Sequence, residues 1–163
     1  MPRFLSVIAG AFILLSSEPS SGVECDISIP EGRVTPDGIT PASDVGDSQR
    51  FVWVGSDNLA AKIPADGRWQ GMGQAYNYRD KFWWWRKGYD AHREWKPELT
   101  IVANRLDQHA DTVAYTHATN AFSGAWNLML HGMEFPSDGC WEVIGEYHGR
   151  QLRFVFEVGG KPR

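Results

Sequence analysis

The stretch Phe135–Val158, FPSDGCWEVIGEYHGRQLRFVFEV, decides the fold of this chain. Two runs that alternate between apolar and polar residues flank His148-Gly149, which suits a two-residue turn because glycine adopts a positive φ without steric cost. Counting outward from that turn pairs Val143 with Phe154. One face of the hairpin then carries its large apolar side chains, namely Trp141, Val143, Leu152, Phe154, Phe156 and Val158. The stretch therefore predicts an antiparallel hairpin with one face against a hydrophobic core.

Shorter runs of the same character precede this hairpin. They cover Arg50–Val54, Leu59–Ile63, Lys81–Arg86, Leu99–Leu106, Thr112–Thr116 and Ala125–Met133, and a loop is expected to begin at Thr119-Asn120. Clusters of Gly, Pro, Asp and Asn separate the runs, as turn residues do between short strands. The pattern predicts an all-β chain, an immunoglobulin-like antiparallel β-sandwich of about seven or eight strands, with a small β-barrel as the alternative.

Composition limits the classes of partner. The 163 residues are 42% hydrophobic and include eight Trp and eight Phe, enough bulky apolar material for the core of one domain. The formal net charge is −4 and the 16 basic residues form no stripe, which argues against a nucleic-acid partner.

The first 22 residues read as a signal peptide. Arg3 supplies a positive start, Phe4–Leu15 is apolar, and the small residues Ser20 and Gly22 precede a cleavage site before Val23. The apolar run is short for a membrane span. An uncleaved anchor and lipid attachment at Cys25 are the alternatives. Residues 23–49 are then an extended lead-in and residues 50–163 the β-sandwich domain, and the export segment is the one expected contact with a membrane.

Two cysteines, Cys25 and Cys140, lie in the exported part. An oxidising compartment favours a disulfide between them, with two separate thiols as the alternative. The bridge would close most of the chain into one loop, worth about 4–5 kcal/mol in the chain-entropy model.

Several motifs together resemble a family of small exported bacterial proteins of uncharacterised role that share a KFxWWR…RLD…FPxxGCWEVxG pattern. The matching residues are Lys81-Phe82, Trp84-Trp85-Arg86, Arg105-Leu106-Asp107, Phe135-Pro136, Gly139–Val143 and Gly145, whereas Trp83 replaces an expected Pro and Ile144 an expected Thr. The resemblance implies a secreted or periplasmic domain of the bacterial cell envelope whose N-terminal cysteine accompanies the one in GCWEV. It implies no catalytic residues.

An aromatic group that begins within the motif KFWWWR and continues after it is the main candidate for a binding surface. It consists of Trp83, Trp84, Trp85, Arg86, Tyr89 and Trp95. Flat rings stack on sugar faces and peptide side chains, so the expected partner is an envelope glycan, peptide or protein. The alternative is that the rings build the core. On a strand, Trp84 must face away from Trp83 and Trp85, so the three cannot share one surface.

Met129, His131 and Met133 form M-x-H-x-M, which puts three side chains on one face of a strand. Thioether and imidazole ligands suit Cu(I), so an envelope copper-binding protein is an alternative function. Ordinary packing of two Met around one His explains the same residues, and we expect no cofactor.

No complete catalytic motif occurs. Carboxylates are present at Asp80, Asp90, Asp107, Asp111, Glu134 and Glu142, but Ser123-Gly124 lacks the nucleophile-elbow pattern. Arg86, Arg105 and Asp107 are as well explained by structural ion pairs. The chain is therefore expected not to be an enzyme, with a hydrolase using an unrecognised carboxylate site as the alternative.

Overall fold

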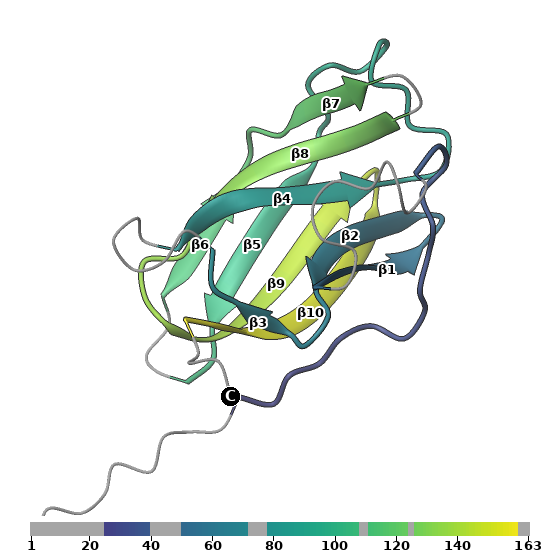
Figure 1. Ribbon diagram of the computed structural model, residues 1–163. Helices are drawn as coiled ribbons and strands as arrows, with labels where there is room; N and C mark the ends of the chain where they lie inside the picture. The colour runs from purple at the N-terminus through teal and green to yellow at the C-terminus, as the bar shows by residue number, and fades with distance from the viewer. Residues whose placement is uncertain (1–24, 40–49, 72–77, 108–110, 124–125, 160–163) are drawn as a thin grey trace, which may run out of the picture.

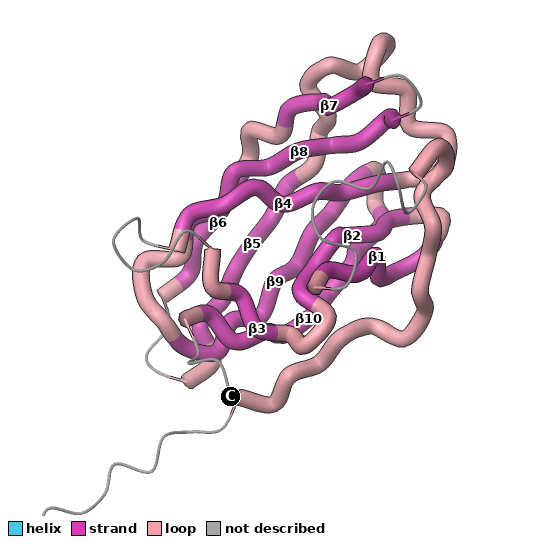
Figure 2. Tube along the Cα trace, in the orientation of Figure 1, coloured by secondary structure: helices cyan, strands magenta, loops and turns pink. Residues whose placement is uncertain are grey.

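The computed structural model describes residues 25–39, 50–71, 78–107, 111–123 and 126–159. These residues form two five-stranded sheets packed face to face, without a helix and not closed into a barrel (Figures 1 and 2). The predicted all-β class and the sandwich architecture of the immunoglobulin-like type are confirmed, and the barrel alternative is excluded. Residues 1–24, which hold the predicted signal peptide, lie outside the described residues. In the described part of the chain, no helix is long and apolar enough to cross a membrane.

The first sheet has the order β1-β2-β4-β8-β7 and is antiparallel throughout. Its strands are β1 (Phe51–Ser56), β2 (Leu59–Pro64), β4 (Arg79–Trp85), β8 (Trp126–Glu134) and β7 (Thr119–Ser123). The second sheet has the order β3-β10-β9-β5-β6, with one parallel pairing between β3 and β10. Its strands are β3 (Arg68–Trp69), β10 (Arg150–Val158), β9 (Gly139–Tyr147), β5 (Thr100–Arg105) and β6 (Thr112–Tyr115).

The hairpin β9–β10 has the predicted register. Tyr147 pairs with Arg150 and Val143 with Phe154, and His148 has a φ of 49° and Gly149 of 70°, the left-handed conformation that a two-residue turn of this kind needs. The six apolar side chains of the predicted inner face are all buried. They meet Phe82, Trp84 and Ile63 of the facing sheet in one hydrophobic core. The alternation of the sequence thus set both the pairing and the buried face.

Two strands were missed by the sequence analysis. Residues 119–123 form β7 at the edge of the first sheet, so the loop expected from Thr119-Asn120 is wrong, and Arg68–Trp69 forms the short strand β3. An edge strand such as β7 pairs on one side only, and a two-residue strand has no detectable period, so neither shows the usual alternation. The structure therefore has ten strands where about seven or eight were expected.

Residues 25–39, the N-terminal strap, close the open side of the sandwich between β10 and β1 (Figure 1). Ser28 exchanges backbone hydrogen bonds with Val155 of β10, and Val34 N–H donates to the carbonyl of Trp53 in β1. The strap is extended, and residues 23–24 and 40–49 of the predicted lead-in lie outside the described residues. It satisfies backbone groups on the edge strand β1 and on the part of β10 that β3 leaves unpaired, which would otherwise be open to pairing with another chain.

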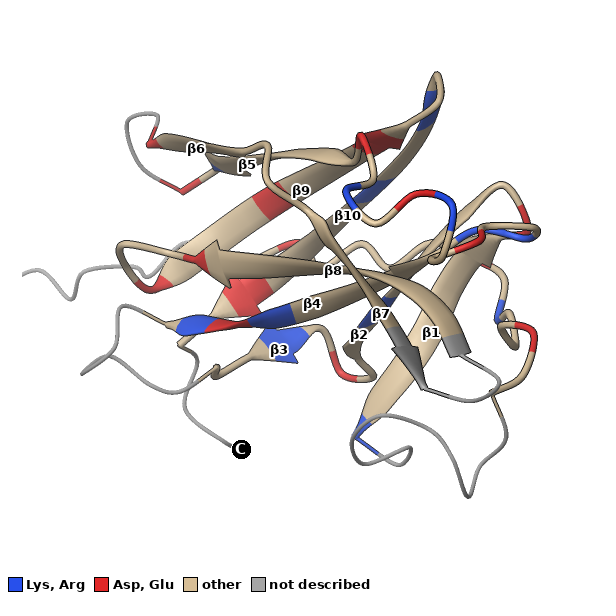
Figure 3. Ribbon diagram, turned by 90° about the horizontal axis from the view of Figure 1, so that it is seen from above, with Lys and Arg blue, Asp and Glu red and all other residues tan. Residues whose placement is uncertain are grey.

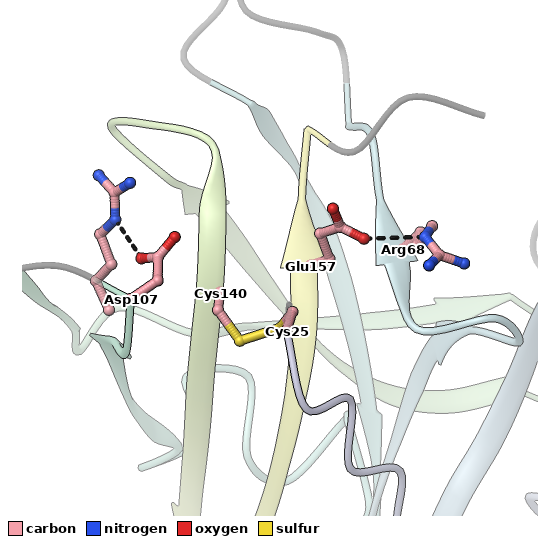
Figure 4. Close-up of a disulfide and its surroundings, with 6 residues drawn as sticks. Cys25, Arg68, Asp107, Cys140 and Glu157 are labelled. Carbon is pink, nitrogen blue, oxygen red and sulfur yellow. Dashed lines mark hydrogen bonds and ion pairs between the residues drawn. A yellow bond between two sulfur atoms is a disulfide. The ribbon is translucent and has the colours of Figure 1, made fainter. Parts of the chain in front are cut away.

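The predicted disulfide joins the strap to β9. Cys25 and Cys140 are linked with a Cα–Cα distance of 5.3 Å, and the cysteines leave no free thiol in the described residues. Figure 4 shows the bridge between two ion pairs, Arg68 with Glu157 and the carboxylate of Asp107 with its arginine partner. This pairing is compatible with an oxidising, extracytoplasmic environment.

The outer faces of the two sheets differ in polarity. In Figure 3 charged positions recur along β9 and β10, where Arg153 and Glu142 form an ion pair, whereas most of β8 is uncharged. The outer face of the first sheet holds a second, smaller hydrophobic cluster. It contains Ile39, Trp53, Ala60, Trp85 and Leu128, with Val34, Trp83 and Ala121 packed against it. Because Val34 and Ile39 belong to the strap, the strap covers this aromatic face.

Candidate functional site

The structure divides the predicted aromatic binding surface among three places. Trp84 faces the core and is fully buried, and Trp85 lies on the opposite face of β4 and is buried under the strap. Trp83 is half-buried beside Trp85. The expectation that Trp84 opposes its two neighbours is confirmed, but these rings do not form one exposed surface. The core has space for Trp84 because Gly145 lies opposite its ring, where an added Cβ would be only 2.4 Å from it.

The remaining three candidates, Arg86, Tyr89 and Trp95, come together in the loop of residues 86–98. This loop crosses from β4 to β5 at the end of the sandwich that also holds the β1–β2 turn and the tip of the β9–β10 hairpin. We call this end of the molecule the hairpin end. Lys87 connects the loop to the β1–β2 turn through an ion pair with Asp57 at 3.0 Å.

Glu94 is the residue that ties the loop to the hairpin. The hydroxyl of Tyr147 donates to Glu94 Oε2 at 2.5 Å, and the other oxygen, Oε1, lies 3.7 Å from His148 Nε2. The backbone N–H of Glu98 donates to the same Oε1 at 3.2 Å. The Tyr89 hydroxyl donates to the Glu94 carbonyl at 2.8 Å. The Glu94 side chain therefore holds the loop of residues 86–98 against the hairpin tip.

The two tyrosines at this site are held in their neutral, donating form. Burial, followed by the neighbouring Glu94 carboxylate, raises the pKa of both Tyr89 and Tyr147 far above the usual value. Their rings pack edge to face at 6.3 Å, and the Arg86 guanidinium lies 5.7 Å above the Tyr147 ring. Sequence reasoning missed Glu94, Tyr147 and His148, because a loop residue and a hairpin tip 53 positions apart share no sequence pattern.

Further hydrogen bonds fix the loop to the first sheet. Asn127 accepts from the Ala91 N–H at 3.1 Å, and the Asn120 side chain donates to the Ala91 carbonyl at 2.5 Å. The backbone N–H of Asn120 donates to the carbonyl of Trp95 at 3.2 Å. The loop is thus anchored to β7, β8 and β9 although it has no regular secondary structure.

Trp95 is the exposed ring of this loop. Its side chain is 64% exposed, whereas Trp53, Trp69, Trp84, Trp85 and Trp141 are at most 6% exposed. The ammonium of Lys96 lies 4.5 Å from the centre of the Trp95 ring, a cation–π contact on one of its faces. An anchored loop therefore presents one large aromatic face to solvent.

A polar hollow of about 420 Å³ lies on the other side of the hairpin tip, between β10 and the β1–β2 turn. Its lining includes Glu31 of the strap, Ser56, Asn58, Arg150 and Gln151. These side chains offer both donors and acceptors to a hydroxylated ligand. The hairpin end thus combines an aromatic platform with a polar hollow.

A second hollow, of about 440 Å³, lies at the opposite end of β1, β2 and β4. Three of its four charged side chains are used within the fold. Arg68 pairs with Glu157 at 2.9 Å, Asp66 accepts from the Arg68 N–H, and Asp80 accepts from the Lys81 N–H. We therefore place the candidate site at the hairpin end.

The candidate carboxylates of the hydrolase alternative mostly pair with arginines. Asp107 pairs with Arg105 at 2.7 Å, which is the structural ion pair offered as the alternative to a catalytic role. The same guanidinium donates to the hydroxyl of Ser137. Burial raises the pKa of Asp107, but the hydrogen bonds from Arg105 and from backbone N–H groups outweigh it and leave that pKa below its usual value. The others pair as Asp90 with Arg93, Glu134 with Arg79 and Glu142 with Arg153. Arg86 lies instead over Tyr147.

The M-x-H-x-M residues share one face of β8, as predicted, and that face is the inner one. Met129 and Met133 are fully buried in the core, and His131 is 4% exposed. They therefore do not form an open metal site on the surface. Within the described residues, no cluster of three or more His, Cys, Asp or Glu side chains forms a metal site either.

No protein-family model, curated protein or solved structure matches this chain.

Proposed function

We propose that this protein is a non-enzymatic binding module of the bacterial cell envelope, secreted or periplasmic, that holds a glycan at the hairpin end. The observation that carries the proposal is Trp95, a largely exposed ring on a loop that hydrogen bonds anchor to three strands. A fixed ring loses little conformational freedom on binding, so more of the contact energy appears as affinity.

A sugar ring is the ligand that these side chains suit best. Its C–H face stacks on a flat aromatic ring, and its hydroxyl groups need donors and acceptors close by. Trp95 supplies the aromatic ring. The polar hollow at the same end of the molecule, lined by Asn58, Arg150 and Gln151, supplies the hydrogen-bond donors and acceptors. The signal peptide predicted for residues 1–22 supports an extracytoplasmic ligand, and the Cys25–Cys140 disulfide is compatible with that location.

The proposal is tested by ¹⁹F NMR of protein labelled with 5-fluorotryptophan, titrated with soluble peptidoglycan fragments and with neutral β-glucan oligosaccharides. One of these glycans is expected to shift the Trp95 resonance, identified by its loss in Trp95→Phe. Trp95→Ala should weaken the affinity at least tenfold, or about 1.4 kcal/mol.

Leu106→Ala is the matched control, since Leu106 is the other exposed large apolar residue of the described part of the chain, at 53%, and lies at the opposite end of β5. It should bind as the wild type does. Unchanged affinity in Trp95→Ala, or shifts produced by peptides and by neither glycan, would refute the proposal.

A further inference from the structure

His131 has an unusual combination of burial and hydrogen bonding. Its ring packs edge to face against Tyr115 at 5.4 Å, and its Nδ1 lies 2.9 Å from the carbonyl oxygen of Gly132. A carbonyl only accepts, so Nδ1 carries the proton and donates. The neutral ring then has its lone pair on Nε2.

That Nε2 atom is buried and has no hydrogen-bond partner among the described residues. A buried acceptor without a donor costs about 1–3 kcal/mol, so a native structure rarely keeps one without a reason.

Met129 and Met133 flank His131 on the same inner face of β8. Side chains two positions apart on a strand are separated by about 7 Å, a gap that an unbranched methionine with three rotatable bonds can span. Both thioethers belong to the hydrophobic core, so they lie in the same dry environment as the imidazole.

We infer that His131 Nε2, with the thioethers of Met129 and Met133, forms a buried site for a soft monovalent metal ion, Cu(I). Soft thioether ligands, together with an imidazole, select Cu(I) over harder ions. The Nδ1 hydrogen bond to a backbone carbonyl is the arrangement that orients metal-binding histidines.

The side of the sandwich next to His131 is the one closed by β6. His131 faces β6, an edge strand whose Tyr115 is half-buried, and His117 is exposed in the connection from β6 to β7. An exposed imidazole close to His131 is a suitable first ligand for an entering ion. This inference is independent of the glycan site at the hairpin end, since it uses none of the same residues.

The test is an anaerobic titration of the disulfide-intact protein with Cu(I), added as its acetonitrile complex, in competition with a chromogenic Cu(I) chelator. One Cu(I) should bind per chain, and X-ray absorption should show one nitrogen and two sulfur ligands. A thiol assay after the titration should detect no free cysteine, which excludes binding to a reduced disulfide.

Two kinds of variant separate binding from folding. Met129→Leu with Met133→Leu keeps the core volume and should weaken Cu(I) binding at least 100-fold while leaving the circular dichroism spectrum unchanged. His131→Phe should abolish binding. His148→Asn, at an exposed histidine with a positive φ that asparagine tolerates, is the matched control and should bind as the wild type does. Absence of Cu(I) binding in the wild type, or full binding in the folded double methionine variant, would overturn the inference.

Discussion

At the scale of single residues, the core depends on a contact between a tryptophan, the largest side chain, and a glycine, which has none. Trp84 of β4 and Gly145 of β9 face each other across the sandwich, and a Cβ on Gly145 would lie 2.4 Å from two atoms of the indole ring. A close-packed interior cannot absorb such an overlap without moving a strand or a ring. The glycine is therefore needed for space rather than for backbone conformation.

Gly145→Ala should lower the free energy of unfolding by about 1–3 kcal/mol, the usual cost of overpacking a core. Chemical denaturation measures this loss. Gly132→Ala is the control, because an added Cβ there meets nothing within 4 Å. Adding Trp84→Phe to Gly145→Ala should recover part of the loss by making room. A Gly145→Ala variant as stable as Gly132→Ala would contradict this account of the core.

At the scale of elements, the 86–98 loop is ordered by side chains of other strands. Its key contacts are the hydrogen bond from Tyr147 of β9 to Glu94 and the contacts of Ala91 with Asn127 and Asn120. Loops of this length without regular structure depend on such contacts to hold one conformation. The position of Trp95 therefore depends on the hairpin tip.

Tyr147→Phe should loosen this loop without unfolding the sandwich. A hydrogen bond to a charged group is worth about 1.5–3 kcal/mol, so amide hydrogen exchange in residues 89–98 should accelerate roughly 10- to 100-fold. Mass spectrometry of peptic fragments measures the rate. Tyr115→Phe is the matched control, since the Tyr115 hydroxyl bonds the backbone of Glu134 instead. Equal loop protection in both variants would show that Glu94 does not hold the loop.

At the scale of the whole molecule, the strap and the disulfide join the two sheets along one open side. The bridge connects residues 115 positions apart and fixes Cys25 beside β10, from where the strap reaches β1. The same segment buries Trp53 and Trp85 on the outer face of the first sheet. Closing so long a loop removes much of the entropy of the unfolded chain.

Replacing both Cys25 and Cys140 by Ala should lower the free energy of unfolding by about 4–5 kcal/mol. Urea denaturation of the variant, compared with oxidised and reduced wild type, measures the loss. The reduced wild type should be destabilised by a similar amount, because the missing constraint is the same. If the variant lost less than about 1 kcal/mol, the bridge would not be a main source of stability.

The sequence by itself determined the architecture of this protein and its covalent link. Alternation with a period of two specified the β9–β10 register and the inner face, since slipping by one residue would expose every aromatic ring of the hairpin. With two cysteines in the sequence, a single intramolecular pairing was possible, Cys25 with Cys140. The alternation at Trp83, Trp84 and Trp85 likewise predicted that the three rings divide between two faces.

Only the tertiary structure decided which aromatic ring is exposed and where the candidate sites lie. A period of two shows that successive residues of a strand face opposite sides of the sheet. It does not show whether another segment covers the outer side, as the strap covers Trp85. Glu94, Tyr147 and His148 meet because a loop and a hairpin tip converge, and the lone pair of His131 is isolated by strands distant in sequence. Such contacts depend on long-range packing, which local patterns do not encode.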